Sequence, residues 1–97
     1  MKLEWDEEKR RRTLKDRGLD FEDCEAVFAG PTFSYVDDRR DYGEDRHVTV
    51  GILDGHLVLI VHTERQDATR IISMRRANAN EAAEFRKYLG IKQRNHE

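Results

Sequence analysis

Residues 48–62 read VTVGILDGHLVLIVH, and this stretch decides the fold. Two apolar runs, 48–53 and 57–61, flank the dipeptide Asp54-Gly55. Asp and Gly tolerate the positive φ that a type I′ turn requires at both of its central residues. The pattern therefore predicts a β-hairpin with a two-residue type I′ turn at 54–55, which pairs Leu53 with His56.

The turn also sets the register of the hairpin. Counting outward places Val48 opposite Val61 and His47 opposite His62. Because side chains alternate along a strand, one face of the hairpin is wholly apolar and the other is mixed. The apolar face comprises Val48, Val50, Ile52, Leu57, Leu59 and Val61. We expect this apolar face to carry the helices.

Cap residues and a change of period define the other elements. Asp6 and Gly18 bound a first predicted helix, and Asp20 and Gly30-Pro31 bound a second. The remaining expected elements are strands at 2–5, 32–35 and 70–75, and a last helix from Asn78 or Asn80 to Gly90. We therefore expect one α+β domain over residues 1–97, with a three- to four-stranded antiparallel sheet, helices on one face and a frayed tail at 92–97.

The composition limits the class of protein. The chain has 97 residues, with 18 Lys and Arg against 20 Asp and Glu and a formal net charge of -2. That length allows one domain, and the near-neutral charge argues against a general nucleic-acid coat protein. The longest apolar run, 57–61, is far shorter than the roughly 20 residues of a membrane-spanning helix, so we expect a cytoplasmic protein without membrane contact. The single cysteine, Cys24, excludes an internal disulfide and a multi-cysteine metal site.

A local excess of positive charge occurs in this near-neutral chain. Four arginines lie within twelve residues, namely Arg65, Arg70, Arg75 and Arg76. Guanidinium groups bind phosphate bidentately and stay charged at any working pH, so such a cluster on neighbouring strands predicts contact with an RNA or DNA backbone. The alternative is a set of surface ion pairs with Glu44, Asp45, Glu64 or Glu81.

Three weaker patterns allow both a functional and an ordinary interpretation. The predicted His47–His62 pair suits acid–base catalysis, but a metal site lacks a third ligand and an ordinary cross-strand pair needs no function. Aromatic residues such as Trp5 and Tyr88 could stack on RNA bases or fill the rim of the core. The run KRRR at 9–12 follows three acidic residues on a predicted helix, and a solvated face with ion pairs is the simpler interpretation.

Several residues also occur together in the order and spacing of a known family. They are Leu3-Glu4-Trp5-Asp6-Glu7 with Lys9, Gly18, Phe21-Glu22, Val27-Phe28, Gly43-Glu44 with Arg46, Gly51, Thr63 with Arg65, Arg70-Ile71-Ile72-Ser73 with Arg75-Arg76-Ala77, and Glu81. On these residues the chain resembles the BrnT family of type II toxin–antitoxin toxins, from residue 3 to about residue 85. The most specific parts are the Trp-Asp start, the Gly-Glu-x-Arg step and the Arg-Ile-Ile-Ser block.

The resemblance implies a RelE-like fold and an endoribonuclease that cleaves RNA without a metal or other cofactor. It also implies a cognate ribbon-helix-helix antitoxin that neutralises the toxin, and a complex of the two that binds operator DNA and represses its own operon. The expected chemistry is attack of a ribose 2′-hydroxyl on the neighbouring phosphate, which needs a proton acceptor, charge stabilisation and a proton donor.

Site residues are carried over position by position. The residues expected to bind the phosphate and stabilise the transition state are Arg65, Arg70, and Arg75 or Arg76. One of three residues is expected to accept the proton from the 2′-hydroxyl: Glu81, Glu64 or His62. The residues expected to contact RNA elsewhere are Trp5, Arg46, Ser73 and Tyr88.

The chain departs from the family pattern in two places. It has Thr13-Leu14-Lys15-Asp16-Arg17-Gly18 where the family usually has Asn-x-x-Lys-His-Gly, and Phe85 where a helical tyrosine is typical. If either missing group serves proton transfer or base stacking, cleavage is expected to be slow, altered in target or absent. A non-catalytic antitoxin-binding module or corepressor of the same fold is therefore the alternative function. A small-molecule enzyme is disfavoured, since the sequence has neither a Gly-rich phosphate loop nor a nucleophile motif.

Overall fold

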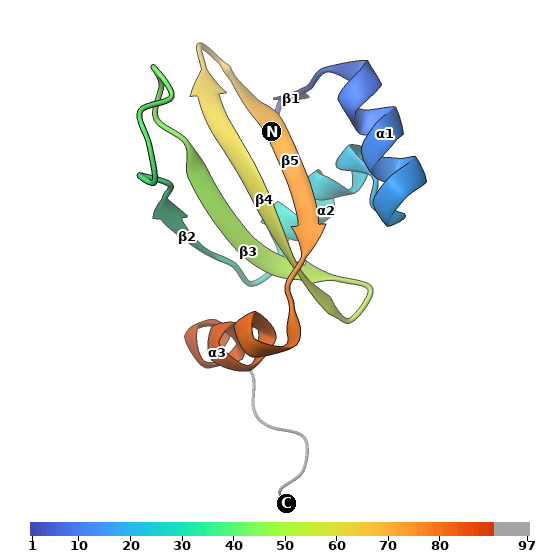
Figure 1. Ribbon diagram of the computed structural model, residues 1–97, viewed down its shortest axis with the longest axis vertical. Helices are drawn as coiled ribbons and strands as arrows, with labels where there is room; N and C mark the ends of the chain where they lie inside the picture. The colour runs from blue at the N-terminus through green and yellow to red at the C-terminus, as the bar shows by residue number, and fades with distance from the viewer. Residues whose placement is uncertain (91–97) are drawn as a thin grey trace, which may run out of the picture.

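The computed structural model describes residues 1–90, so the fraying predicted for 92–97 lies outside the described residues. Within that range the chain forms a five-stranded sheet with helices around it (Figure 1). The elements are β1 (Leu3–Glu4), α1 (Glu7–Arg17), the 3-10 helix η1 (Phe21–Asp23), α2 (Cys24–Ala29), β2 (Phe33–Val36), β3 (His47–Leu53), β4 (His56–Arg65), β5 (Ala68–Arg76) and α3 (Ala79–Leu89). The strand order is β1-β5-β4-β3-β2.

Strands β2 to β5 form a continuous antiparallel meander. β1 adds to the outer edge of β5 in the parallel direction, with Leu3 opposite Thr69 and Glu4 opposite Arg70. The predicted α+β class and the predicted order of strands and helices are confirmed, and the parallel β1 makes the sheet mixed. This arrangement is compatible with the RelE-like fold that the resemblance implies.

The β3–β4 hairpin has the predicted register. Leu53 pairs with His56 beside the turn, and His47 pairs with His62 at the far end. Asp54 and Gly55 form the turn with φ of 51° and 80°. Positive φ at both positions is the property for which the Asp-Gly pair is suited.

The predicted cap residues bound the helices. The Asp6 carboxylate accepts hydrogen bonds from backbone N–H groups of the first turn of α1, the shorter at 2.9 Å, and Gly18 ends that helix with φ of 70°. At α3, the Asn78 side chain accepts from the Glu81 N–H at 2.8 Å, while the Glu81 carboxylate accepts from the Asn78 N–H at 3.0 Å. This capping box makes Asn78, rather than Asn80, the start of the last helix.

The prediction that the helices would share the apolar face of the hairpin is wrong. α2 and η1 pack on the opposite, mixed face, where Val58, Ile60 and Met74 are fully buried. Gly51 explains this packing, because a Cβ at that position would collide with Cγ1 of Val27 from α2. The glycine leaves a groove for a helix side chain, and the mixed face therefore becomes a close-packed core.

α3 lies across the other face at one end of the sheet (Figure 1). There Phe85 and Leu89 pack, together with Phe33 of β2, against the buried residues Val50 and Leu59. The helices therefore occupy both faces of the sheet rather than one.

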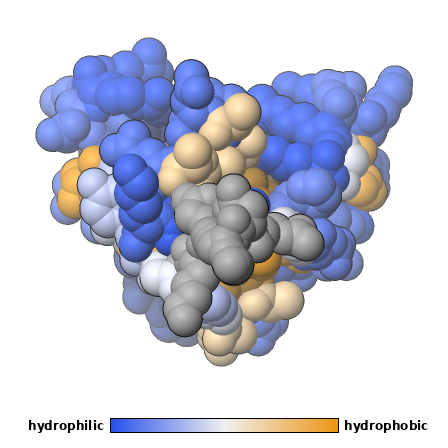
Figure 2. All heavy atoms as spheres, turned by 90° about the horizontal axis from the view of Figure 1, so that it is seen from below, coloured by the Kyte–Doolittle hydropathy of each residue, from blue (hydrophilic) through white to orange (hydrophobic). Residues whose placement is uncertain are grey.

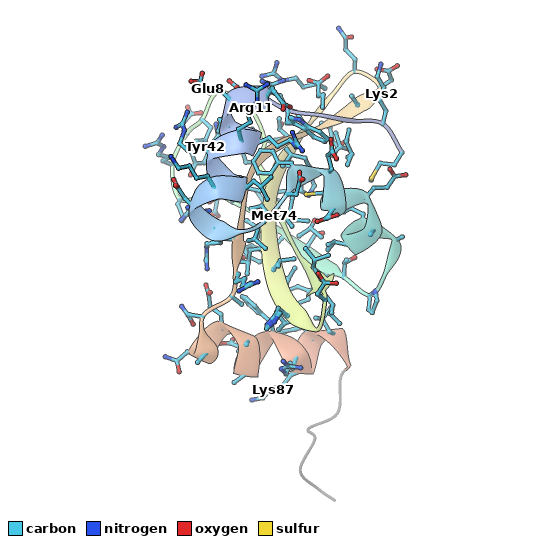
Figure 3. All side chains as sticks on the ribbon, turned by 90° about the vertical axis from the view of Figure 1, so that its right-hand side faces the viewer. Lys2, Glu8, Arg11, Tyr42, Met74 and Lys87 are labelled. Atoms are coloured by element: carbon cyan, nitrogen blue, oxygen red, sulfur yellow. The ribbon has the colours of Figure 1, made fainter. Side chains whose placement is uncertain are left out.

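α1 flanks the sheet instead of covering either face. Figures 1 and 3 place it along the outer edge of β5, and Figure 3 shows α2 on the other side of that edge. None of the α1 residues is buried. Two arginines anchor the helix, since Arg17 donates to the Met74 carbonyl at 2.7 Å and Arg10 donates to Asp20 at 2.8 Å.

Hydrophilic residues make up most of the surface at the α3 end, and hydrophobic residues form separate patches there (Figure 2). Three of the exposed large apolar side chains, Tyr35, Val36 and Tyr88, come from β2 and α3. These two elements meet where the Phe33 ring contacts the Tyr88 ring. Within residues 1–90, no helix is long and apolar enough to span a membrane.

The close approach at Gly51 yields a stability prediction. We expect Gly51→Ala to lower the free energy of unfolding by about 1–3 kcal/mol, because the new methyl group overpacks a core whose Val27 side chain is buried and stiff. Urea denaturation measures the change. Gly30→Ala is the matched control, since its nearest neighbour would be 3.8 Å away and its φ is -98°. Equal stabilities of the two variants would contradict the packing argument.

Candidate functional site

A bulge in β5 determines which of its side chains share a face. Val61 pairs with Ser73 and His62 pairs with Ile71, so Ile72 is an extra residue without a partner on β4. A side-chain period of two would otherwise place residues 70 and 73 on opposite faces. The bulge therefore brings Arg70 to the face that Ser73 already occupies.

We call this the open face, meaning the part of the α3-bearing face that extends beyond α3. Ser73 pairs with Val61 and Arg75 pairs with Leu59, so both serine and arginine lie on this face. Arg70, opposite Thr63, lies on the same face. Three of the predicted site residues thus share one side of one strand.

A first hollow lies on the open face, between β5, the start of α3 and the segment after β2. Its volume is about 370 Å³. Its polar lining consists of Tyr35, Asp37, Asp38, Arg39, Ser73, Arg75 and Glu81, and its apolar lining of Val36, Val48, Leu59 and Val61. Ser73, Arg75 and Glu81 were candidates from the sequence. Asp37, Asp38 and Arg39 were missed, since the charged loop in which they lie gave no signal of its own.

Carboxylates hold both arginines of the first hollow. Arg75 donates to Glu81 from Nη1 and from Nη2, each at 2.8 Å. Arg39 donates to Asp37 from Nε and from Nη2, also each at 2.8 Å. Bidentate pairs of this kind fix the direction of the guanidinium plane. Within residues 1–90, Arg75 Nε and Arg39 Nη1 have no hydrogen-bond partner, so each arginine keeps a donor for a ligand.

The Arg75–Glu81 and Arg39–Asp37 pairs also keep the two carboxyl groups ionised. The Arg75 guanidinium, with help from the Asn78 N–H, lowers the pKa of Glu81 to about 2. The Arg39 guanidinium similarly lowers the pKa of Asp37 to about 2. Carboxylates with such a low pKa are weak proton acceptors at neutral pH. Glu81 is therefore better suited to positioning Arg75 than to removing a proton.

Tyr35 brings a hydroxyl group to the hollow. It belongs to β2, where it pairs with Val48, and 43% of it is exposed. Partial burial raises the pKa of Tyr35, and the nearby Glu81 carboxylate raises it further. The hydroxyl therefore keeps its proton at neutral pH and can donate it.

Two predicted phosphate or RNA contacts lie at the other end of β4. Arg65 Nη2 and Arg46 Nε each lie 3.5 Å from a Glu44 carboxylate oxygen. Arg46 also lies over the Tyr42 ring, 4.1 Å from its centroid. These contacts form a separate cluster, and Arg65 with Glu44 is one of the surface ion pairs that the sequence allowed as an alternative.

Arg70 lies between this cluster and the first hollow. Its Nη1 donates to Glu4 of β1 at 3.3 Å. Its partner Thr63 lies four residues from Leu59, the partner of Arg75, and four steps of extended strand correspond to about 13 Å. The two arginines are therefore placed to contact different phosphates of a bound strand.

The structure places Arg76, His62 and Glu64 on the opposite side of the sheet. The His62 side chain is 10% exposed, and its Nε2 shares a hydrogen bond of 2.7 Å with Thr49 Oγ1. Burial lowers the pKa of His62, which keeps the imidazole neutral. Because the sheet lies between these three residues and Arg75, they do not enter the first hollow.

The predicted His47–His62 pair is present as a stack with ring centroids 5.8 Å apart. The Phe28 ring of α2 packs edge-on against His62 at 5.2 Å. In the described part of the chain, no group of three or more His, Cys, Asp and Glu side chains is arranged to hold a metal ion. The pair is thus part of the packing between α2 and the sheet.

The two predicted aromatic contacts have different surroundings. The Trp5 ring packs against Phe21 at 6.2 Å, and its Nε1 donates to Glu7 at 3.2 Å. Tyr88 is 66% exposed, and its ring lies 5.2 Å from that of Phe33. Trp5 therefore fills the rim of the core, whereas Tyr88 presents its ring on the surface of α3, outside the lining of the first hollow.

A second hollow lies between α1 and the outer edge of β5. Its volume is about 190 Å³. Its lining consists of Lys9, Arg12, Thr13, Asp16, Arg17, Ile72 and Ser73. Ser73 lines both hollows, so the two meet at this residue.

A family model described as "Ribonuclease toxin, BrnT, of type II toxin-antitoxin system" matches residues 5–81. This range contains every residue that lines the two hollows. The chain belongs to the BrnT family. No curated protein matches the chain. Membership places the chain among the ribonuclease toxins of type II systems, which implies an RNA target and an antitoxin partner.

The BrnT positions at which this chain departs from the usual pattern fall in two environments. Thr13, Asp16 and Arg17 all line the second hollow. Phe85 instead packs in the core beneath α3, with its ring 5.4 Å from that of Phe33. The departures therefore change the chemistry of the second hollow and leave the lining of the first unchanged.

The pairing of Glu81 with Arg75 predicts a pH dependence of stability. Glu81 has a lower pKa in the folded chain than the ordinary value of 4.5, so its ionised form stabilises the fold. We expect Glu81→Gln to reduce the free energy of unfolding by about 1 kcal/mol above pH 4.5, and this difference to disappear as the pH falls towards 2. Chemical denaturation at several pH values measures it.

Glu84→Gln is the control for this experiment, because Glu84 has no ion-pair partner within residues 1–90. A Glu81→Gln effect that persists undiminished at pH 2 would show that the charge of Glu81 is not what stabilises the fold.

Proposed function

We propose that the chain is a metal-independent endoribonuclease that cleaves RNA in the first hollow by 2′-hydroxyl attack, and that a ribbon-helix-helix antitoxin neutralises it. One observation carries the proposal. In a member of the BrnT family, Arg75 and Arg39 are each oriented by a carboxylate around an open hollow that holds a protonated tyrosine. Fixed guanidinium groups stabilise the negative charge that develops on a phosphate during transfer.

The proposed reaction forms a bond between the ribose 2′-oxygen and phosphorus and breaks the bond from phosphorus to the 5′-oxygen. Arg75 and Arg39 bind the non-bridging oxygens, and the Tyr35 hydroxyl donates its proton to the departing 5′-oxygen. The products are a cyclic phosphate and a 5′-hydroxyl. Arg70, further along the open face, contacts a more distant phosphate of the same strand.

Asp38 is our candidate for the proton acceptor. Of the three carboxylates that line the first hollow, Asp37 and Glu81 are paired with arginines, and Asp38 is not paired within residues 1–90. An unpaired carboxylate at this position is free to take the 2′-hydroxyl proton. Glu81 then acts through Arg75 as a positioning residue.

Cleavage assays test the role of the first hollow. We expect purified protein to cleave RNA in the presence of EDTA, and Arg75→Ala to lower the rate at least tenfold, equivalent to about 1.4 kcal/mol of barrier. Arg76→Ala is the matched control, because it removes the neighbouring arginine from the opposite face. Thermal melting checks that both variants fold.

Two results would overturn this assignment. Loss of cleavage with the chelator would exclude the metal-independent reaction, and equal rates for Arg75→Ala and Arg76→Ala would exclude the first hollow as its location.

The antitoxin part of the proposal rests on the type II family assignment. We expect the reading frame beside the gene to encode a small ribbon-helix-helix protein, and we expect the toxin to arrest growth when it is expressed without that partner. Co-expression of the partner should restore growth and yield a complex that elutes as one species. A non-catalytic antitoxin-binding module would form the same complex without causing arrest, so growth separates the two functions.

A further inference from the structure

The four consecutive basic residues of α1, at positions 9–12, are divided by the fold. Arg10 donates to Asp20 at 2.8 Å and to Glu7 at 2.7 Å, so its charge is used within the chain. Arg11 is 76% exposed and lies 3.4 Å from the same Glu7. Lys9 and Arg12, three residues apart and on one side of the helix, instead line the second hollow.

The second hollow has the composition of an anion site. Three cationic side chains, Lys9, Arg12 and Arg17, line it against one carboxylate, Asp16. Arg17 is held in place because its Nη1 donates to the Met74 carbonyl at 2.7 Å. A site with two net positive charges and a fixed guanidinium suits a phosphodiester group. The first hollow, by contrast, already pairs each of its arginines with an acid.

The two hollows are arranged to accept one continuous strand. β1 pairs with β5 only at Thr69 and Arg70, so within residues 1–90 no strand covers the edge of β5 beyond that point. α1 runs along this edge (Figures 1 and 3), and the bulge residue Ile72 and its neighbour Ser73 form the floor between helix and sheet. Because Ser73 lines both hollows, the shortest path from the first hollow to the second passes this serine.

We propose that the groove between α1 and β5, formed by Lys9, Arg12, Arg17 and Ser73, binds a backbone phosphate of the RNA strand next to the phosphate that is cleaved. This inference rests on the proposed function, because it takes the first hollow as the place of cleavage. Contacts to a phosphate carry no base information, so the groove adds affinity irrespective of sequence. Lys9 and Arg12 are exposed residues of a helix without buried side chains, and their substitution leaves the core intact.

Binding of an uncleavable RNA tests the groove. The probe is a single-stranded oligonucleotide with 2′-O-methyl riboses, which lack the attacking hydroxyl. We expect the double variant Lys9→Ala, Arg12→Ala to bind it at least tenfold more weakly than the unmodified protein in fluorescence anisotropy. The salt dependence of the affinity should also become shallower, by about 0.7 in the log–log slope for each phosphate that the protein no longer neutralises.

Arg11→Ala is the matched control. It removes one positive charge from the same helix but from outside the hollow, so we expect its affinity and salt slope to remain those of the unmodified protein. If the Lys9, Arg12 double variant binds the oligonucleotide as tightly as Arg11→Ala does, the groove does not hold RNA and the inference is overturned.

Cleavage kinetics separate this inference from the proposed function. In the double variant we expect the loss to appear as a higher KM, whereas Arg75→Ala lowers kcat. A fall in kcat as large as that of Arg75→Ala would mean that the groove belongs to the reaction centre, which overturns a flanking phosphate site. If the unmodified protein binds the probe through the groove but cleaves no RNA, the proposed ribonuclease function is wrong, and the groove is still shown to bind RNA.

Discussion

The pairing of β4 with β5 around one extra residue, Ile72, is the constraint on which the candidate site depends. The bulge turns Arg70 to the side of the sheet that carries Ser73 and Arg75, and the bulge residue Ile72 lines the hollow between β5 and α1. Bulges are suited to this role because they re-aim a side chain while the ladder continues on either side. Here the bulge lies inside the Arg-Ile-Ile-Ser block, which is one of the most specific parts of the family resemblance.

Individual carboxylate–arginine pairs, rather than the net charge of the chain, describe the electrostatics of this protein. The chain is near neutral, yet its acids are used to orient particular arginines: Glu81 orients Arg75, and Asp37 orients Arg39. A guanidinium held in this way needs little rearrangement to meet a phosphate, which is how fixed charges lower a barrier. The groove beside α1 differs, since its cations exceed its acids, and that difference fits a site that binds phosphate without acting on it.

Much of the fold was predictable from short-range signals, whereas much of the site was not. The Asp-Gly turn predicted the hairpin register, and the Asp6 and Gly18 caps predicted the limits of α1, because these effects act within a few residues. For the start of α3 the sequence offered Asn78 or Asn80, and the capping box in the structure selects Asn78. The side on which η1 and α2 pack was mispredicted, because the role of Gly51 depends on a side chain from α2 that is distant in sequence. The place of Arg39 in the first hollow depends on how a charged loop folds back over the sheet, and no local pattern specifies that.

The sequence by itself determined the α+β class, the hairpin register, the limits of α1 and membership of the BrnT family, since each follows from residue types at fixed spacing. Only the tertiary structure decided which arginines lie together. Four arginines that are close in sequence are divided between the two faces of the sheet and along its length, because strand alternation and the bulge decide the face of each one. A carboxylate then fixes the direction of Arg65, Arg70 and Arg75. Contacts between residues that are distant in sequence leave no pattern in a single amino-acid sequence, and the geometry of the site depends on such contacts.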